Sequence, residues 1–358
     1  MNAADVPTSP VRARGTNQAQ PSPILSVRHL TKHFPLRSRG FLKRETGLVR
    51  AVDDVSFDLQ PGETLGLVGE SGSGKTTTAR CILRAITPTS GEVRFRTPDG
   101  RVTDLATVPE RALKPLRPHL QMVFQDPFSS LNPRLPVGQI VGEPLVVHRM
   151  GGRREIDDRV ADMLRKVGLK PEHRTRYPHA FSGGQRQRIG IARALIMRPS
   201  LIVADEAVSA LDVSVQAQIL NLLKELQAEF SLTYLFVAHN LDVVRHFCDR
   251  VAVMYAGRIV ELAPTPRLFS SPQHPYTRSL LAAVPWPDPD RPMRLDVAGE
   301  TADPSHLAPG CAFHPRCPVC FEPCRRIQPP LLGRTPPDHL VACHLPPDRS
   351  APDDAAPG

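Results

Sequence analysis

Apolar runs alternate with amphipathic stretches along most of the chain. Continuous or alternating apolar residues between turn signals predict strands over Ile24–Phe34, Val52–Leu59, Thr64–Val68, Leu120–Gln125, Leu201–Ala204 and Thr233–Ala238. Apolar residues at helical spacing, or capping signals, predict helices over Lys75–Ile86, Ile156–Val167, Arg186–Met197, Val215–Phe230 and Pro275–Val284. We therefore expect an α/β fold with buried parallel strands.

Several segments carry no such pattern. Residues 1–22 are polar and rich in Pro and Ala, and we interpret them as a disordered lead, with residues 346–358 as a disordered tail. Residues 35–49 are basic and rich in Gly and Arg, which indicates a flexible insertion. Between about residues 126 and 180 the character changes to helices, so we expect a small helical subdomain there.

Composition narrows the function classes. The chain has 358 residues, enough for about two domains, and its 45 Lys and Arg against 36 Asp and Glu give a net charge of +9. The basic residues are scattered, so the charge is a weak indication of a membrane surface or an anionic ligand and not of nucleic acid. No apolar run reaches the roughly 18 to 20 residues that span a bilayer, and we expect a chain that is soluble by itself.

The stretch Gly69–Thr76 reads Gly-Glu-Ser-Gly-Ser-Gly-Lys-Thr and directly follows the apolar run Thr64–Val68. Free backbone N–H groups between a strand and a helix start converge on a point where an anion can bind. Lys75 is expected to reach the β- and γ-phosphates of a nucleotide, and Thr76 to complete a Mg²⁺ shell. The expected nucleotide contacts are Gly69, Ser71, Gly72, Ser73, Gly74, Lys75, Thr76 and Thr77. A glycine-rich hairpin is the alternative, although strand, loop and helix all occur in order.

Two carboxylates, Asp205 and Glu206, follow the apolar run Leu201–Ala204. Ligands of open α/β sheets bind at the carboxyl ends of the strands. We expect Asp205 to hold Mg²⁺, directly or through water, and Glu206 to orient or deprotonate an attacking water. The alternative is an acidic pair that caps a helix.

Three further segments each allow two interpretations. His239 ends the run Thr233–Ala238, where it either contacts a γ-phosphate or is structural. The turn Ser182-Gly183-Gly184-Gln185 opens a helix, as a second anion site or as an ordinary N-cap. Phe34 either stacks on a base or packs at a strand edge.

In order and spacing these motifs resemble the ATPase domains of ABC transporters. The resemblance rests on Gly69–Thr76, Gln125, Ser182–Gln185, Asp205-Glu206, Ser209-Ala210-Leu211-Asp212 and His239. Two longer motifs, Gln125–Pro133 and Gln273–Thr277, resemble the ATP-binding subunits of bacterial oligopeptide and dipeptide importers, as does the insertion Gly40–Val52. The resemblance covers residues 24 to 345, and implies an ATPase domain over residues 23–270 and an importer-type C-terminal extension over residues 271–345.

The resemblance also implies residue roles. Gln125 would contact Mg²⁺ and water, His239 would hold the γ-phosphate, and Phe34 would stack on adenine. Ser182, Gly183, Gly184 and Gln185, together with Asp212, would complete the ATP site of a second subunit that faces this one head to tail. The implied catalytic set is Lys75, Gln125, Glu206 and His239, and the implied Mg²⁺ set is Thr76, Gln125 and Asp205. Ala207 departs from the family, which commonly has Pro after the catalytic Glu.

A protein of this family would hydrolyse ATP to power peptide import, as a peripheral subunit on the cytoplasmic face of the membrane. The implied partners are a second ATPase subunit, two transmembrane permease subunits and, indirectly, an extracytoplasmic solute-binding protein. A heterodimer of ATPase subunits is expected, with a homodimer left open. Import of nickel or another small solute is an alternative. A soluble ABC ATPase acting on ribosomes or DNA is less well supported, because no tandem ATPase halves or long coiled coil are visible.

Five of the seven cysteines fall within residues 311–343. In a chain without an export signal, such clustering indicates metal ligation before disulfides. Cys311, Cys317, Cys324 and Cys343 match a cysteine quartet in the C-terminal extension of peptide-importer ATPases, some of which hold an iron–sulfur cluster there. Four thiolates suit a [4Fe–4S] cluster or zinc, and a site without metal stays open. The remaining cysteines are Cys320, an extra cysteine that could substitute for one of the four, and Cys81 and Cys248, which we expect to be small core residues.

Overall fold

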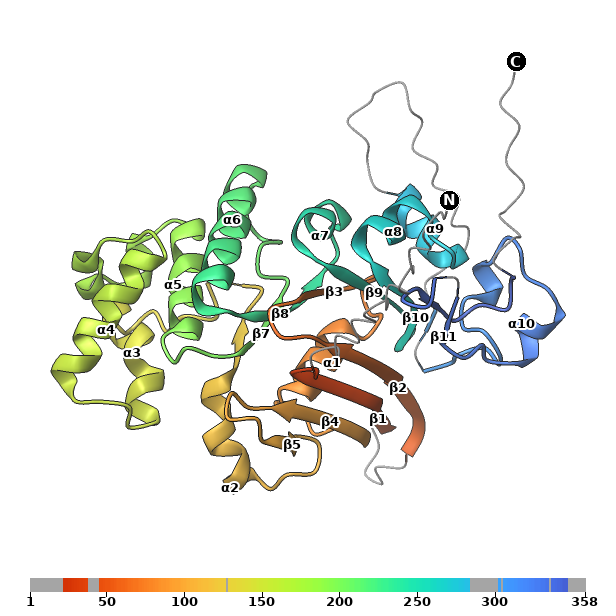
Figure 1. Ribbon diagram of the computed structural model, residues 1–358, viewed down its shortest axis with the longest axis horizontal. Helices are drawn as coiled ribbons and strands as arrows, with labels where there is room; N and C mark the ends of the chain where they lie inside the picture. Colours follow the sequence, from red (N-terminus) through yellow and green to blue (C-terminus); the bar gives the residue numbers. More distant parts are fainter. Residues whose placement is uncertain are drawn as a thin grey trace, which may run out of the picture.

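The computed structural model describes residues 22–37, 45–126, 128–283, 302–303, 305–334 and 336–346. The predicted lead and tail lie outside these residues, apart from residues 22 and 346. Two sheets, of eight and of four strands, form the framework, and helices gather at one end and along one face of the larger sheet (Figure 1). Among the described residues, no helix is long and apolar enough to cross a bilayer.

The larger sheet has the strand order β11-β12-β10-β9-β3-β8-β7-β6. Its strands are β3 (Thr64–Val68), β6 (Leu120–Val123), β7 (Leu201–Asp205), β8 (Thr233–Ala238), β9 (Arg250–Tyr255), β10 (Arg258–Pro264), β11 (Leu332–Gly333) and β12 (Leu340–Val341). The five strands from β9 to β6 are parallel, and β10 is antiparallel to β9. Every residue of β3, β7 and β8 is buried, because packed layers cover both faces of the sheet.

The smaller sheet is antiparallel, in the order β2-β1-β4-β5. Its strands are β1 (Leu25–Arg37), β2 (Glu45–Leu59), β4 (Ser90–Arg96) and β5 (Val102–Asp104). The prediction of a flexible insertion over residues 35–49 was wrong at both ends, because β1 and β2 remain paired as far as Arg37 and Glu45. Backbone pairing continues there although Leu36 and Leu48 are exposed, so no buried apolar face marks these residues in the sequence. Residues 38–44 of the insertion lie outside the described part of the chain.

Helix α1 (Lys75–Ile82) lies between the two sheets. It is shorter than predicted, because the chain leaves the helix at Leu83 and Arg84 adopts a left-handed φ of 56°. The other helices are α2 (Glu110–Leu113), α3 (Val137–Val147), α4 (Arg153–Lys166), α5 (Gly183–Leu195), α6 (Val213–Phe230), α7 (Leu241–Phe247), α8 (Thr265–Ser270), α9 (Pro275–Ala282) and α10 (Glu322–Arg326). The 3-10 helices are η1 (Lys114–His119), η2 (Pro171–Thr175), η3 (Pro178–Ala180) and η4 (His314–Arg316).

Two apolar cores hold these layers together. One lies between the two sheets around α1, and the other lies under α3 to α8 and reaches the C-terminal region. Figure 1 shows α3, α4 and α5 together at one end of the molecule, and α6, α7 and α8 along one face of the larger sheet. Helices α3 and α4 fall within the range expected for a helical subdomain, whose bounds stay a prediction.

The C-terminal region is anchored to the larger sheet at Glu261 on β10. Strand β12 pairs with β10, with Val341 opposite Glu261. The Glu261 carboxylate is fully buried and accepts hydrogen bonds from the backbone N–H groups of Gln273 and His274, at 2.8 and 2.9 Å. His339 Nε2 lies 2.6 Å from the same carboxylate. A buried carboxylate needs such partners, so these bonds fix residues 273–274 and 339–341 against the sheet.

Candidate active site

Four neighbouring parallel strands bring the predicted groups to one edge of the larger sheet. The residue pairs at their carboxyl ends are Val68 with Ala238, Asp205 with Val237, and Val123 with Ala204. Directly beyond these ends follow the phosphate loop, His239, Glu206 and Gln125. The edge therefore collects residues that are far apart in the sequence.

Lys75 stabilises the phosphate loop from within. Its Nζ donates hydrogen bonds to the carbonyl oxygens of Gly69 and Glu70, each at 2.8 Å, and the side chain is buried. Burial lowers the pKa of Lys75, whereas the nearby charges of Glu206, Asp205 and Glu70 raise it. The ammonium group thus lies inside the loop, close to three carboxylates.

Gly69 is required by its surroundings. Its φ is +151°, and a Cβ at this position would lie 2.2 Å from the carbonyl oxygen of Met254. We expect Gly69→Ala to lower the free energy of unfolding by several kcal/mol, since backbone must move to relieve the overlap. Gly62→Ala is the matched control, because Gly62 has a φ of +76° with nothing within 4 Å and should cost only about 1–2 kcal/mol. Urea denaturation of both nucleotide-free variants measures the difference, and equal losses would contradict the steric explanation.

Thr76 and Asp205 meet across the site. Thr76 Oγ1 donates a hydrogen bond of 2.9 Å to Asp205 Oδ1. Burial raises the pKa of Asp205, and the bond from Thr76 partly opposes this effect. Hydroxyl and carboxylate oxygens are ligands that Mg²⁺ accepts, so the pair can hold this ion.

Glu206 is the meeting point of the remaining groups. Gln125 Nε2 donates a hydrogen bond of 2.6 Å to Glu206 Oε2, and His239 Nδ1 lies 3.4 Å from the same oxygen. Glu206 has a left-handed φ of 48°, and its N–H donates to the carbonyl of Val237. Non-glycine residues in this conformation are uncommon and often occur at functional sites. An amide, an imidazole and a carboxylate thus converge where a water could be activated.

The turn Ser182–Gln185 lies elsewhere. Ser182 caps α5 and forms a reciprocal capping box with Gln185. A Cβ on Gly184 would lie 2.6 Å from Val215 Cγ1, so glycine lets α5 approach α6 closely. Asp212 is the exposed N-cap residue of α6 and makes no side-chain capping bond. These residues lie at the N-termini of α5 and α6, two helices that Figure 1 shows apart from α1.

Phe34 lies on β1 and is exposed, with the Lys32 Nζ 4.9 Å from its ring centroid. Phe34 is the last residue of the predicted strand Ile24–Phe34, and β1 continues beyond it to Arg37. The neighbouring strand β2 contributes Ala51, whose carbonyl oxygen would lie 2.1 Å from a Cβ on Gly74 of the phosphate loop. The hairpin that carries Phe34 therefore adjoins the loop.

Sequence reasoning missed two residues that contact the phosphate loop. Tyr276 Oη accepts a hydrogen bond from the N–H of Glu70, and Arg316 pairs with the Glu70 carboxylate. The motif Gln273–Thr277 drew attention to Tyr276 only as part of a family pattern. Glu70 lies inside the predicted phosphate loop, but nothing in the sequence marked Arg316 or its contact with Glu70.

The four cysteines of the quartet line one small cavity of about 10 Å³, together with His274, His314 and His344. Cys320 is not among the lining residues. All seven cysteines are free thiols. Within the described residues, no three His, Cys, Asp or Glu side chains are placed to hold a metal ion. Cys81 and Cys248 are buried, which confirms their prediction as core residues.

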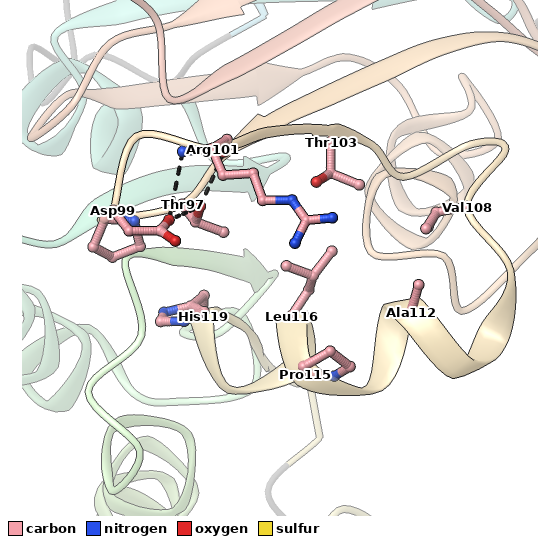
Figure 2. A pocket seen from close by; sticks show the side chains of 10 residues that line it. Thr97, Asp99, Arg101, Thr103, Val108, Ala112, Pro115, Leu116 and His119 are labelled. Carbon is pink, nitrogen blue, oxygen red and sulfur yellow. Dashed lines mark hydrogen bonds between the residues drawn. The ribbon is translucent and has the colours of Figure 1, made fainter.

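A larger hollow lies away from the strand ends. It measures about 470 Å³, and its lining comes from the turn between β4 and β5, from β5 itself, and from α2 and η1 with the residues before them. Figure 2 shows the Arg101 guanidinium pointing into it between Thr103 and Leu116, with His119 nearby. None of the predicted site residues lines this hollow, so its size does not make it the nucleotide site.

Comparison with known proteins agrees with this geometry. Residues 52–209 match the ABC transporter family, and residues 260–324 match the oligopeptide/dipeptide transporter C-terminal region. A probable peptide ABC transporter ATP-binding protein of Sinorhizobium fredii is 54% identical over 90% of each chain. The chain belongs to the ATP-binding proteins of peptide ABC transporters. An oligopeptide transport ATP-binding protein of Bacillus subtilis is 50% identical over 90% of this chain and 97% of its own.

Solved structures agree with the fold of this ABC protein. A dimeric ATP-binding cassette in a post-hydrolysis state with ADP and phosphate is 28% identical, with a TM-score of 0.58 over 67% of this chain and 98% of its own. The predictions of the ABC-type α/β fold and of the family are confirmed. The chain is an ABC ATPase, and this family uses ATP with Mg²⁺.

Proposed function

We propose that this chain hydrolyses ATP to power the import of oligopeptides or dipeptides across the cytoplasmic membrane. The observation that carries the proposal is the convergence of Lys75, Thr76, Asp205 and Glu206 at one sheet edge. It occurs in a chain whose residues 260–324 match the peptide-transporter C-terminal region. The relatives named as peptide or oligopeptide transport proteins support the substrate class.

In this proposal each residue has a definite role. Lys75 and the backbone N–H groups of Gly69–Thr77 bind the phosphates. Thr76, Asp205 and Gln125 would hold Mg²⁺, which would supply positive charge to offset the negative charge of the phosphate oxygens. Glu206 orients and deprotonates the attacking water, and His239 contacts the γ-phosphate. Phe34 stacks on the adenine, for which its exposed ring on the adjoining hairpin is suited.

The second ATPase subunit would use the surface at the N-termini of α5 and α6. There Ser182, Gly183, Gly184 and Gln185 form the start of α5, and Asp212 is the N-cap residue of α6. Helix N-termini favour anions, so this surface can face a nucleotide that is bound to a partner. Two ATP molecules would then stabilise a closed dimer, expected here as a heterodimer, and hydrolysis would release it.

The two permease subunits would dock beside Gln125. A cleft of about 820 Å³ lies there, and its lining includes Phe124, which directly follows β6, Glu143 on α3 and Arg193 on α5. Phe124 is exposed and directly precedes Gln125, so pressure on the cleft would reach the catalytic site. A photo-cross-linking residue in place of Phe124 should label a permease, whereas one in place of the exposed Phe321 should not. Peripheral binding at the cytoplasmic face follows from this docking, with the solute-binding protein acting on the far side.

Transport itself gives the test. The chain is purified anaerobically with its co-purifying membrane subunits, placed in vesicles, and supplied with ATP and a mixed peptide pool. Peptide uptake that stops with Glu206→Gln would support peptide import. If no peptide is taken up while ATP hydrolysis continues, nickel or another small solute, or a role outside transport, would replace the proposal.

We further propose that Cys311, Cys317, Cys324 and Cys343 hold a metal centre, as a [4Fe–4S] cluster or as zinc. The support is that all four thiols line one cavity, and thiolates suit both kinds of centre. In the structure the four cysteine side chains are not arranged as a set of metal ligands, so metal binding would draw their thiols together.

Iron, zinc and acid-labile sulfide per chain, measured after anaerobic purification, distinguish the two centres. Cys324→Ser should lose the metal, and Cys320→Ser should keep it. A wild-type chain with neither metal would refute the proposal.

A further inference from the structure

Glu70, the second residue of the phosphate loop, is held at three points. Its carbonyl accepts the hydrogen bond from Lys75, at 2.8 Å. Its N–H donates to Tyr276 Oη at 2.9 Å, and its carboxylate accepts two bonds from the Arg316 guanidinium, at 2.9 and 3.1 Å. Tyr276 and Arg316 both belong to the C-terminal extension, more than 200 positions further along the chain. The extension therefore contacts the phosphate loop directly.

Aromatic side chains hold the Arg316 side chain in place, in addition to its bonds with Glu70. Its side chain is 8% exposed, and its guanidinium carbon lies 5.9 Å from the ring centroid of Tyr255 and 5.8 Å from that of Phe313. Tyr255, Tyr276 and Phe313 pack on one another with ring centroids 4.6 to 5.4 Å apart. A buried aromatic cluster thus sets the position of the guanidinium, and a bidentate pair with a carboxylate is the stronger, more directional form of ion pair.

The ion pair between Arg316 and Glu70 also neutralises a negative charge that would oppose ATP binding. Glu70 places a negative charge in a loop that, in the proposed function, receives the polyphosphate of ATP. Like charges at such short range oppose binding, most of all where protein excludes water. Two hydrogen bonds from Arg316 neutralise the carboxylate and turn it toward the extension.

We propose that Arg316 and Tyr276 are positioning residues for ATP binding, through which the C-terminal extension braces the phosphate loop and neutralises Glu70. Neither residue needs to touch the nucleotide. The inference rests on the proposed ATP site at Gly69–Thr76. It gives the extension a role in nucleotide affinity in addition to any metal that its cysteines hold.

The test uses the full chain, a fluorescent ATP analogue with Mg²⁺ for the Kd, and steady-state hydrolysis for kcat and KM. Arg316→Gln should raise the Kd and the KM by roughly tenfold, the order expected for losing a charge-assisted pair, and should change kcat much less. Arg325→Gln is the matched control, because Arg325 is an exposed arginine on α10 of the same extension, outside the contact with Glu70. It should bind ATP as the wild type does.

A second substitution separates positioning from a merely structural role. In Arg316→Gln the Glu70 carboxylate is left unpaired, so adding Glu70→Gln should restore a large part of the lost affinity. A merely structural Arg316 would give no such rescue, and this outcome would overturn the proposal. So would a Kd for Arg316→Gln within twofold of the wild type.

Two further variants keep the test open if Arg316→Gln does not fold. Arg316→Lys retains the charge and should give an intermediate Kd, and Tyr276→Phe removes only the acceptor for the Glu70 N–H and should raise the Kd by about threefold. Wild-type Kd values in both would overturn the proposal. If instead the wild-type chain does not bind the analogue, the proposed ATP site itself fails.

Discussion

Replacing Glu206 with Gln is expected to abolish steady-state ATP hydrolysis while ATP binding persists. Glutamine has the shape of glutamate and can still bond to Gln125 and lie beside His239, so the loop geometry should survive. It cannot accept a proton from water, and loss of a general base costs about 10²- to 10⁴-fold. Phosphate release and binding of a fluorescent ATP analogue measure the two effects separately.

The control for this variant is Glu225→Gln. Glu225 is an exposed glutamate on α6, outside the site, so the same change of charge should leave turnover unaffected. Near-normal hydrolysis by Glu206→Gln would remove Glu206 from the catalytic role. Loss of binding as well as turnover would indicate that it holds the site together instead.

The candidate site was predictable because its parts follow local rules. A buried strand, a Gly-rich turn and a helix start mark Gly69–Thr76, and an apolar run marks the strand before Asp205 and Glu206. Parallel strands align their carboxyl ends, so the geometry of the sheet by itself brings these residues together. Local pattern and sheet geometry are sufficient for this part of the fold.

The order in which the strands pair in the sheet could not be predicted from local patterns. Strands β9 and β10 were missed, although β9 pairs with β3 and so supports the phosphate loop from the other side. The apolar run Val251–Tyr255 resembles the other buried strands, yet nothing local states which strand it joins. The outer part of the β1–β2 hairpin was missed because it is exposed, and exposure removes the alternation that reveals a strand.

The contact between Arg316 and Glu70 is the clearest case of a feature without a sequence signal. The two residues are 246 positions apart. They meet because β10, β12 and the buried carboxylate of Glu261 fix the extension beside β9, whose end adjoins the loop. Each step depends on tertiary packing, which the periodicity of a single segment does not encode.

Lys75→Ala is expected to weaken ATP binding by about 10²-fold or more. Its ammonium lies inside the phosphate loop. Burial leaves few competing water molecules there, which strengthens the electrostatic attraction between the ammonium and a bound anion. A hydrogen bond to a charged group contributes about 1.5–3 kcal/mol, and two such bonds to phosphate oxygens account for this loss. Titration with a fluorescent ATP analogue measures the Kd, and hydrolysis should fall in parallel.

Removal of Lys75 also leaves the carbonyls of Gly69 and Glu70 without their donor, so the loop itself could rearrange. Lys114→Ala is the control for charge alone, since Lys114 is exposed on η1. Restoring only the charge, with Lys75→Arg, should not recover full affinity, because the larger planar guanidinium does not fit between two carbonyls at 2.8 Å. An unchanged Kd in Lys75→Ala would show that ATP binds elsewhere, and the site at the strand ends would then have to be abandoned.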